Sequence, residues 1–255
     1  MANKLISFLY HEVTNNPKNS GFQRSGAIPY KHSIYHFKND LNLILKHFEK
    51  SEDVRNITKG DMSKLILTFD DGGRSAIDIA KILRNKNLIG HFLITTSMIG
   101  ESTFLDIKQI IEIKQMGHII GAHSHNHPSI FRELSYKDKI NEWRKSKKIL
   151  DRILNEEVVV ASIPGGDMDQ DTIRSAGEVG IKYLFTSEPN YTPYEKFGVL
   201  VIGRVYPKNT TSSSQITQWA MGKGFVKAQL IRSIKEFIRC RLKFVYKFYI
   251  KRKLL

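Results

Sequence analysis

The chain has 255 residues, a formal net charge of +15 and a single cysteine, Cys240. This length is enough for one α/β domain of about 250 residues and leaves no room for a second full domain. One cysteine excludes an internal disulfide and is compatible with a reducing cytoplasm. The N-terminal apolar run is short and is soon followed by His11 and Glu12, so it predicts a first strand rather than a signal peptide or a spanning helix.

Apolar, strand-like runs alternate with amphipathic segments along most of the chain. This alternation predicts parallel strands joined by helices, with the functional groups gathered at one rim of the sheet. Residues 15–31 are expected to form a polar, irregular loop. Strands are expected at 5–10, 65–69, 90–95, 118–122, 157–162, 182–186 and 199–205, and helices at 37–50, 75–86, 106–116, 134–155 and 169–179.

Two adjacent carboxylates, Asp70 and Asp71, follow the expected strand 65–69 directly. Gly72 and Gly73 come next and allow the backbone to turn at once. Because neighbouring side chains at a strand end point in different directions, one carboxylate can bind a metal while the other accepts a proton. The alternative is an ordinary Asp-Gly turn after a strand.

Three histidines, His123, His125 and His127, follow the expected strand 118–122, and Pro128 ends the run. Imidazole nitrogens are common ligands of zinc-like metals, and two of them with one carboxylate make an open catalytic site. A solvated loop is the alternative for a histidine cluster considered alone. The position at a strand end, in line with that of the two aspartates, favours the metal site.

The segments Thr68-Phe-Asp-Asp-Gly72 and His123-Ser-His-Asn-His-Pro128 resemble the first two motifs of the metal-dependent polysaccharide deacetylases, a family that includes chitooligosaccharide, chitin and peptidoglycan deacetylases. The resemblance extends over about residues 8–204. It implies an α/β fold, a single distorted (β/α) barrel of about seven strands. It also implies a hydrolase that removes N-acetyl groups from the sugars of a surface polysaccharide or of its lipid-linked precursor.

The resemblance implies a role for each polar residue of these two motifs. Asp71, His123 and His127 would bind a divalent metal, with Zn²⁺ expected and Co²⁺ or Ni²⁺ as alternatives. Asp70 would be the base that takes a proton from the attacking water. His125 is expected to have no direct role.

The chain departs from the family pattern at two positions. Ser162 stands where the third motif usually has an arginine that contacts the base, and Arg204 is expected to take over that contact with Asp70. No histidine follows His127, although many members use a late histidine as the general acid. His11, at the end of the first strand, is the predicted proton donor; a structural histidine is the alternative.

Two loops are expected to meet the substrate. In one, Pro164 fixes the loop after strand 157–162, and the backbone N–H of Gly165 is the predicted second donor to the oxyanion. In the other, Tyr191 and Tyr194 are predicted to stack on pyranose faces, with ordinary loop packing as the alternative.

Residues 223–255 are predicted to form a basic amphipathic helix outside the barrel domain of residues 1–222. This tail holds eleven Lys and Arg against the single Glu236, a net charge of +10 that leaves +5 for the rest of the chain. Its aromatic residues favour binding to an anionic membrane surface; packing on the barrel and nucleic-acid binding are the alternatives. With no signal peptide expected, the tail predicts a cytoplasmic enzyme at the inner membrane face.

Other functional classes are left open by the sequence. O-deacetylation is chemically close to N-deacetylation, and a non-catalytic carbohydrate-binding relative would fit the missing arginine and the missing late histidine. The expected partner is an acetylated oligo- or polysaccharide. A nucleic-acid-binding protein is permitted by charge alone, but the chain contains no recognised nucleic-acid motif, so none is expected to bind.

Overall fold

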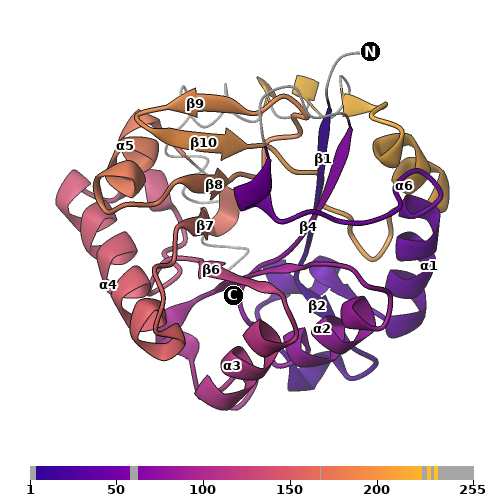
Figure 1. The fold of residues 1–255 in the computed structure, drawn as a ribbon, viewed down its shortest axis with the longest axis horizontal. Coiled ribbons are helices and arrows are strands. Elements are labelled where there is room, and N and C mark those ends of the chain that lie inside the picture. Colours follow the sequence, from indigo (N-terminus) through magenta and orange to yellow (C-terminus); the bar gives the residue numbers. More distant parts are fainter. Residues whose placement is uncertain (1–3, 58–62, 167, 226–228, 231–232, 235–255) are drawn as a thin grey trace.

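The fold is built around one curled sheet with helices around it (Figure 1). The computed structural model describes residues 4–57, 63–166, 168–225, 229–230 and 233–234. The strand order in the sheet is β1-β4-β5-β6-β7-β8-β10-β9, and every neighbouring pair is parallel except β10 with β9. The strands are β1 (Leu5–Tyr10), β4 (Lys64–Phe69), β5 (His91–Ile94), β6 (Ile119–Ala122), β7 (Val160–Ser162), β8 (Tyr183–Phe185), β9 (Tyr194–Lys196) and β10 (Val199–Ile202).

The two ends of the parallel part of the sheet meet each other. Val205, just after β10, forms a parallel bridge with Phe8 of β1. The N–H of Leu9 donates to the carbonyl of Val205 at 2.8 Å, and the N–H of Val205 donates to the carbonyl of Ser7 at 2.9 Å. The sheet is therefore a distorted barrel, and the predicted fold class is confirmed.

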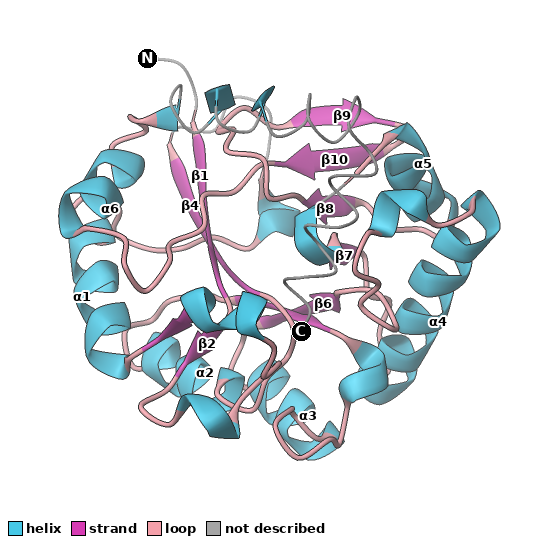
Figure 2. Ribbon diagram, turned by 180° about the vertical axis from the view of Figure 1, so that it is seen from behind, coloured by secondary structure: helices cyan, strands magenta, loops and turns pink. Residues whose placement is uncertain are grey.

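Six α-helices, whose bounds are given at the end of this paragraph, lie outside this sheet (Figure 2). Side-chain caps set where several of them begin: the hydroxyl of Ser33 accepts from the N–H of His36, so the first helix begins three residues earlier than predicted. The last helix, beside the first, was not predicted; Asn39 reaches Ser213 at 3.4 Å. The helices are α1 (Ile34–Ile44), α2 (Ala76–Arg84), α3 (Ile107–Gln115), α4 (Tyr136–Leu154), α5 (Gln170–Glu178) and α6 (Ser213–Ala220).

Three very short strands were also missed by the sequence pattern. The edge strand β9 pairs only with β10, and a separate two-stranded sheet joins β2 (Glu12–Val13) to β3 (Lys31–His32). Segments of two or three residues carry no detectable periodicity, and here pairing with a distant segment makes them strands. For the same reason β7 is shorter than predicted, because only Val160–Ser162 pairs with its neighbours.

The interior of the barrel is closed by apolar side chains from the described parallel strands. Because side chains alternate along a strand, residues two or four positions after these apolar residues face the same interior. These positions are Asp70, His123, Ser162 and Arg204, so polar groups from four strands meet above an apolar floor. The floor consists of Leu5, Ile66, Leu93, Ile119, Val160, Phe185 and Ile202.

Most of the predicted C-terminal helix, residues 223–255, lies outside the described residues. The domain boundary near residue 222 and the membrane role of the tail therefore stay predictions. No helix of the described chain is long and apolar enough to cross a membrane.

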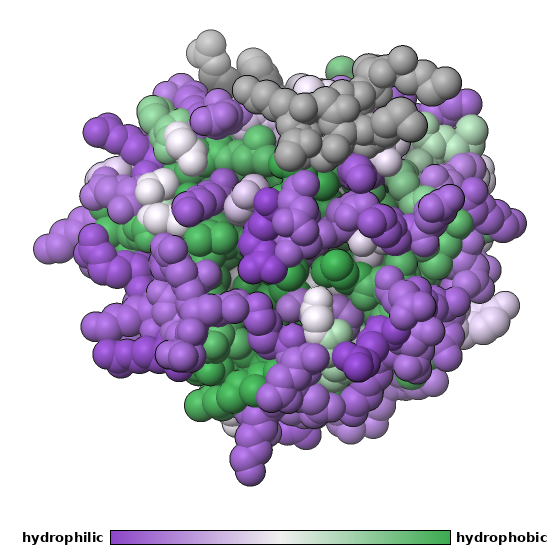
Figure 3. Space-filling model, in the orientation of Figure 1, coloured by the Kyte–Doolittle hydropathy of each residue, from purple (hydrophilic) through white to green (hydrophobic). Residues whose placement is uncertain are grey.

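On the face seen in Figure 3, polar side chains dominate the periphery, where the helices lie.

Candidate active site

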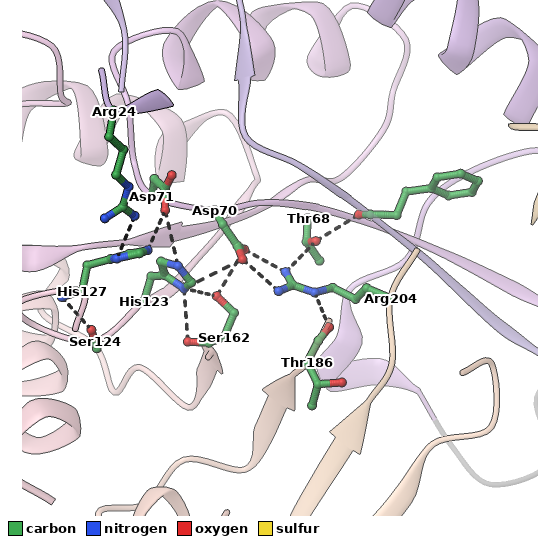
Figure 4. Close-up of polar contacts among 11 residues, drawn as sticks. Arg24, Thr68, Asp70, Asp71, His123, Ser124, His127, Ser162, Thr186 and Arg204 are labelled. Atoms are coloured by element: carbon green, nitrogen blue, oxygen red, sulfur yellow. Dashed lines mark hydrogen bonds and ion pairs between the residues drawn. The ribbon is translucent and has the colours of Figure 1, made fainter. Parts of the chain in front are cut away.

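The two adjacent aspartates point to different partners at the C-terminal end of β4 (Figure 4). The carboxylate of Asp70 contacts Arg204 and Ser162 and lies 3.8 Å from Nδ1 of His123, whereas that of Asp71 faces the Nε2 atoms of His123 and His127. Both aspartates are buried. The alternation of direction expected at a strand end therefore separates the two carboxylates into two environments.

Asp71, His123 and His127 bring three potential metal-ligand atoms within 4.8 Å of one another. The Nε2 atoms of both histidines lie 3.4 Å from Oδ1 of Asp71. This oxygen is buried and has no hydrogen-bond partner among the described residues. An unpartnered buried carboxylate oxygen facing two imidazole nitrogens fits a divalent cation, so these residues suit the metal that the sequence implies.

The ring of His123 is oriented by Ser162 at the end of β7. Its Nδ1 lies 2.6 Å from the Ser162 hydroxyl and 3.2 Å from the Ser162 carbonyl. The hydroxyl donates to Oδ1 of Asp70 at 3.2 Å, so it accepts from Nδ1–H of the imidazole. This assigns the proton to Nδ1 and leaves the Nε2 lone pair directed toward Asp71, the tautomer that a metal ligand needs.

Three non-glycine residues around the site have left-handed backbone conformations. The φ angles are 76° at Asp71, 59° at Ser124 and 51° at His127. Such conformations cost about 1–3 kcal/mol each and persist only where the surrounding structure enforces them. The backbone here is held in a strained form that directs the candidate metal-ligand side chains to one point.

A glutamate from α4 holds the histidine loop. Glu142 accepts hydrogen bonds from the N–H groups of His125 and Asn126 at 2.9 and 2.8 Å. The ring of His125 turns to Thr96, whose hydroxyl lies 2.9 Å from its Nδ1. His125 thus lies apart from the Asp71 cluster.

Arg204 forms a two-point ion pair with Asp70. Its Nη1 and Nη2 donate to the two carboxylate oxygens at 2.7 and 2.8 Å. Nη1 also donates to the Thr68 hydroxyl at 3.0 Å and Nε to the Thr186 carbonyl at 2.8 Å, and the whole arginine is buried. The structure therefore places Arg204 in the contact with Asp70 that an arginine at position 162 would otherwise make.

Both carboxylates remain ionised in this surrounding. Burial alone raises the pKa of Asp70, but the Arg204 guanidinium and His123 outweigh it, so the pKa lies below the usual value. For Asp71, burial is likewise outweighed by the neighbouring imidazoles of His11, His123 and His127, and the pKa falls well below the usual value. At neutral pH the site offers two anionic groups, one paired with an arginine and one open to a cation.

His11 lies beside the two aspartates. It follows β1, and the N–H of Asp70 donates to the carbonyl of the preceding Tyr10 at 3.0 Å. Its Nδ1 is buried without a hydrogen-bond partner in the described part of the chain. Burial lowers the pKa of His11, and the charges of Asp71 and Asp70 oppose this shift.

The predicted oxyanion loop lies at the end of β7, next to Ser162. Pro164 is buried, and Gly165 is exposed with a left-handed φ of 63°. The nearest atom to a Cβ added at Gly165 would be the carbonyl oxygen of Ser129, at 3.9 Å. The loop therefore stands next to the segment that follows the histidines.

Of the two predicted sugar-stacking tyrosines, the structure uses Tyr191 for packing at the other end of β1. The carbonyl of Tyr191 accepts from Leu5 at the beginning of β1, the opposite end from His11, and its ring packs on Phe225. Tyr194 lies on the edge strand β9. The prediction that Tyr191 meets substrate is corrected, because its ring is used for packing at the N-terminal end of β1.

Comparison with known proteins gives the same family as the motifs. The family described as polysaccharide deacetylase matches residues 58–184. The chain belongs to the polysaccharide deacetylase family. YxkH of Bacillus subtilis (strain 168), named among the polysaccharide deacetylases, is 25% identical over 206 residues, which cover 79% of this chain and 71% of that protein.

Solved structures of deacetylases share the fold. The deacetylase PplD of Streptococcus pyogenes, in complex with acetate, superposes with a TM-score of 0.70 at 20% identity, over 85% of this chain and 98% of that one. The IcaB structure from Ammonifex degensii has a TM-score of 0.69 at 17% identity, over 86% and 98% of the two chains. At this identity the likeness establishes the barrel, and the family assignment makes the protein a hydrolase of the deacetylase type.

Several residues that shape the deacetylase site were not assigned a role from the sequence. Ser162 was noted only as a departure, although its position two residues after the inward-facing Val160 was a usable signal. Glu142 and Arg24 lie on a charged helix and in a polar loop, where no periodicity distinguishes them from solvated residues. Contacts between segments far apart in the chain give them their positions.

A further buried carboxylate, Glu12, stands next to the turn after Asp71. Its Oε2 accepts hydrogen bonds from the hydroxyls of Ser20 and Ser75, and its side chain packs so closely on Gly73 that a Cβ there would overlap it. Burial raises the pKa of Glu12 from 4.5 to about 7. Glu12 thus joins β2 to the start of α2 beneath the site.

We expect Glu12→Gln to become progressively more stable than the wild type as the pH rises. The folded pKa exceeds the unfolded one, so the contribution of Glu12 is fully present below pH 4.5 and is lost as the pH passes 7. The difference in free energy of unfolding should grow by about 3 kcal/mol over this interval and stay constant above it. Urea denaturation at several pH values measures it, with the exposed Glu101→Gln as control; a constant difference would contradict the assignment.

Proposed function

We propose that this deacetylase is a metal-dependent hydrolase that removes N-acetyl groups from the sugars of a polysaccharide. The observation that carries the proposal is the pair of adjacent carboxylates with separate partners. Asp71 faces two imidazole Nε2 atoms at 3.4 Å, and Asp70 is held by the Arg204 guanidinium at 2.7 and 2.8 Å. This arrangement supplies a cation site and a fixed, ionised base side by side.

Asp71, His123 and His127 would hold the divalent metal, for which Zn²⁺ is the expected ion. A divalent metal in such a site lowers the pKa of water toward ~7 and polarises the acetyl carbonyl. The buried, unpartnered Oδ1 of Asp71 and the tautomer of His123 support this role.

Asp70 is the proposed general base. As water adds to the acetyl carbon, Oδ of Asp70 accepts its proton while both oxygens stay hydrogen-bonded to Arg204. Breakage of the carbon–nitrogen bond then needs a proton on the leaving amine, and His11 is the proposed donor of that proton. The products are acetate and the free amino sugar, and the proton that Asp70 takes from water replaces the one that His11 gives to the amine, so atoms and charge balance.

The backbone N–H of Gly165 is the proposed donor to the oxyanion that forms on the acetyl group. The left-handed conformation of Gly165 and the space beside it permit close approach of a substrate oxygen. Its neighbour Ser162 contacts both the base and a metal-ligand histidine, so the donor loop and the catalytic groups share one support.

Structural relatives support the choice of an amide substrate. A de-N-acetylase from Aggregatibacter actinomycetemcomitans superposes with a TM-score of 0.70 at 16% identity, over 85% of this chain and 100% of that one. That protein is described as a de-N-acetylase, and we infer the same reaction type here. O-deacetylation is the alternative that the experiment below separates.

We expect the protein to release acetate from oligomers of N-acetylglucosamine, to lose this activity with a chelator and to regain it with Zn²⁺, Co²⁺ or Ni²⁺. Acetate is measured by an enzyme-coupled assay, beside an O-acetylated oligomer of matched length. His127→Gln should abolish both the activity and zinc binding, whereas His125→Gln, two residues away, should retain both. Activity that persists in the metal-free protein would overturn the metal dependence, and acetate released only from the O-acetylated oligomer would overturn the amide assignment.

A further inference from the structure

Arg24 lies beside His127, one of the proposed metal ligands (Figure 4). Its guanidinium carbon is 4.5 Å from the centre of the Phe22 ring, and Phe22 in turn packs against His127 with ring centres 4.9 Å apart. The arginine comes from the loop after β2. The rings of Phe22 and His127 therefore hold the positively charged guanidinium of Arg24 next to the catalytic groups.

In its contact with Arg24, the ring of His127 has a tautomer that cannot bind a metal through Nε2. Nη2 of Arg24 lies 3.3 Å from Nδ1 of His127. A guanidinium only donates, so Nδ1 accepts here and the ring proton is on Nε2, facing Asp71 at 3.4 Å. His123 has the opposite tautomer, because its Nδ1 donates to Ser162.

A metal on the Asp71 cluster requires the lone pair of Nε2 on His127. The proton of the neutral imidazole then resides on Nδ1, where it meets the N–H groups of Arg24, and two donors cannot bond. The positive charge of the metal also repels the guanidinium. The contact seen here and metal binding therefore exclude each other.

Once released, the guanidinium needs another partner. In the described chain its contacts are the rings of His127 and Phe22, neither of which is an anion. A carboxylate fits the planar fork of an arginine with two parallel hydrogen bonds. The net charge of +15 also favours the approach of acidic polymers.

We propose that Arg24 is a specificity-determining residue that leaves His127 when metal binds and then engages a carboxylate carried by the substrate, as on a uronic acid next to the acetylated sugar. This inference rests on the proposed function for the identity of the substrate. It couples the two ligands, because each one removes Arg24 from His127 and so favours binding of the other.

Zinc titration of the metal-free protein against a chromophoric chelator tests the first half. Arg24→Gln should bind zinc about fivefold more tightly than the wild type, since the competing hydrogen bond is lost. Arg152→Gln, an exposed arginine of α4, removes the same charge elsewhere and should leave zinc affinity unchanged. Equal or weaker zinc binding by Arg24→Gln would overturn the exclusion between the contact and the metal.

Calorimetry of the zinc-loaded protein tests the second half. Arg24→Gln should weaken binding of an oligosaccharide that alternates N-acetylglucosamine with a uronic acid by about tenfold or more, and leave binding of neutral N-acetylglucosamine oligomers unchanged. Arg24→Lys should restore part of the loss. If Arg24→Gln weakened the binding of both oligomers equally, recognition of a substrate carboxylate would be overturned. An equally large loss of affinity for free acetate alone would also overturn it. These readings are binding measurements, so a failure of acetate release alone would count against the proposed function and not against Arg24.

Discussion

Replacing Asp70 with Asn is expected to lower the rate constant for acetate release by about 10²–10⁴-fold, because it removes the proposed proton acceptor while nearly preserving shape. The loss should appear in kcat rather than in KM, since Asp70 is held by Arg204 and Ser162 inside the barrel. Steady-state acetate release from N-acetylglucosamine oligomers at saturating zinc measures the effect. Circular dichroism at the assay temperature establishes that the variant is folded.

The neighbouring Asp71→Asn is the matched control, because it changes the same atoms one residue away. We expect it to weaken zinc binding strongly, whereas Asp70→Asn should bind zinc nearly as well as the wild type. This contrast follows from the separate environments of the two carboxylates. Loss of zinc binding in Asp70→Asn, or retention of its activity, would show that the roles of base and ligand are assigned incorrectly.

Replacing Arg204 with Met is expected to destabilise the protein by about 3–5 kcal/mol, the largest stability effect that we anticipate. The substitution leaves the buried carboxylate of Asp70 without its ion partner and the carbonyl of Thr186 without its donor. It also raises the pKa of Asp70 toward neutrality, so catalysis should decline along with stability. Urea denaturation at pH 7 measures the free energy of unfolding.

A double-mutant cycle identifies the cause. Combining Arg204→Met with Asp70→Asn removes both charges, so the double variant should be less destabilised than the sum of the two single changes. Arg204→Lys keeps the charge but cannot reach both carboxylate oxygens and Thr186 together, and should recover only part of the loss. Additive effects in the cycle, or a loss below 1 kcal/mol for Arg204→Met, would contradict a stabilising ion pair.

The sequence anticipates the elements of the barrel because their signals are long and local. Each parallel strand carries an apolar run of three to six residues, and most helices begin at a capping side chain such as Ser33 or Asp106. The adjacent aspartates and the histidine cluster could be identified from the sequence for the same reason, since each lies directly after an apolar strand. The unpredicted elements are short and owe their structure to distant partners: β2 and β3 pair with each other, and β9 with β10.

Which side chains meet at the rim was decided by tertiary structure. Arg204 was inferred to replace a missing arginine, and alternation from Ile202 directs it into the barrel, but only the closure of β10 on β1 brings it within 2.7 Å of Asp70. Tyr191 shows the reverse, because a loop that was expected at the rim returns to the start of β1. Arg24 had no signal at all in its polar loop, and its contact with His127 exists through the fold alone.

The sequence by itself determined the strand-helix order, the family and the kinds of chemical group at the strand ends, because these depend on residue type and on spacing along one segment. The tertiary structure decided the pairing of those groups, the tautomer of each histidine and the ionisation of each carboxylate. Such properties depend on distances of a few ångströms between side chains that are 39 to 134 residues apart in the chain, and the closure of the barrel sets those distances.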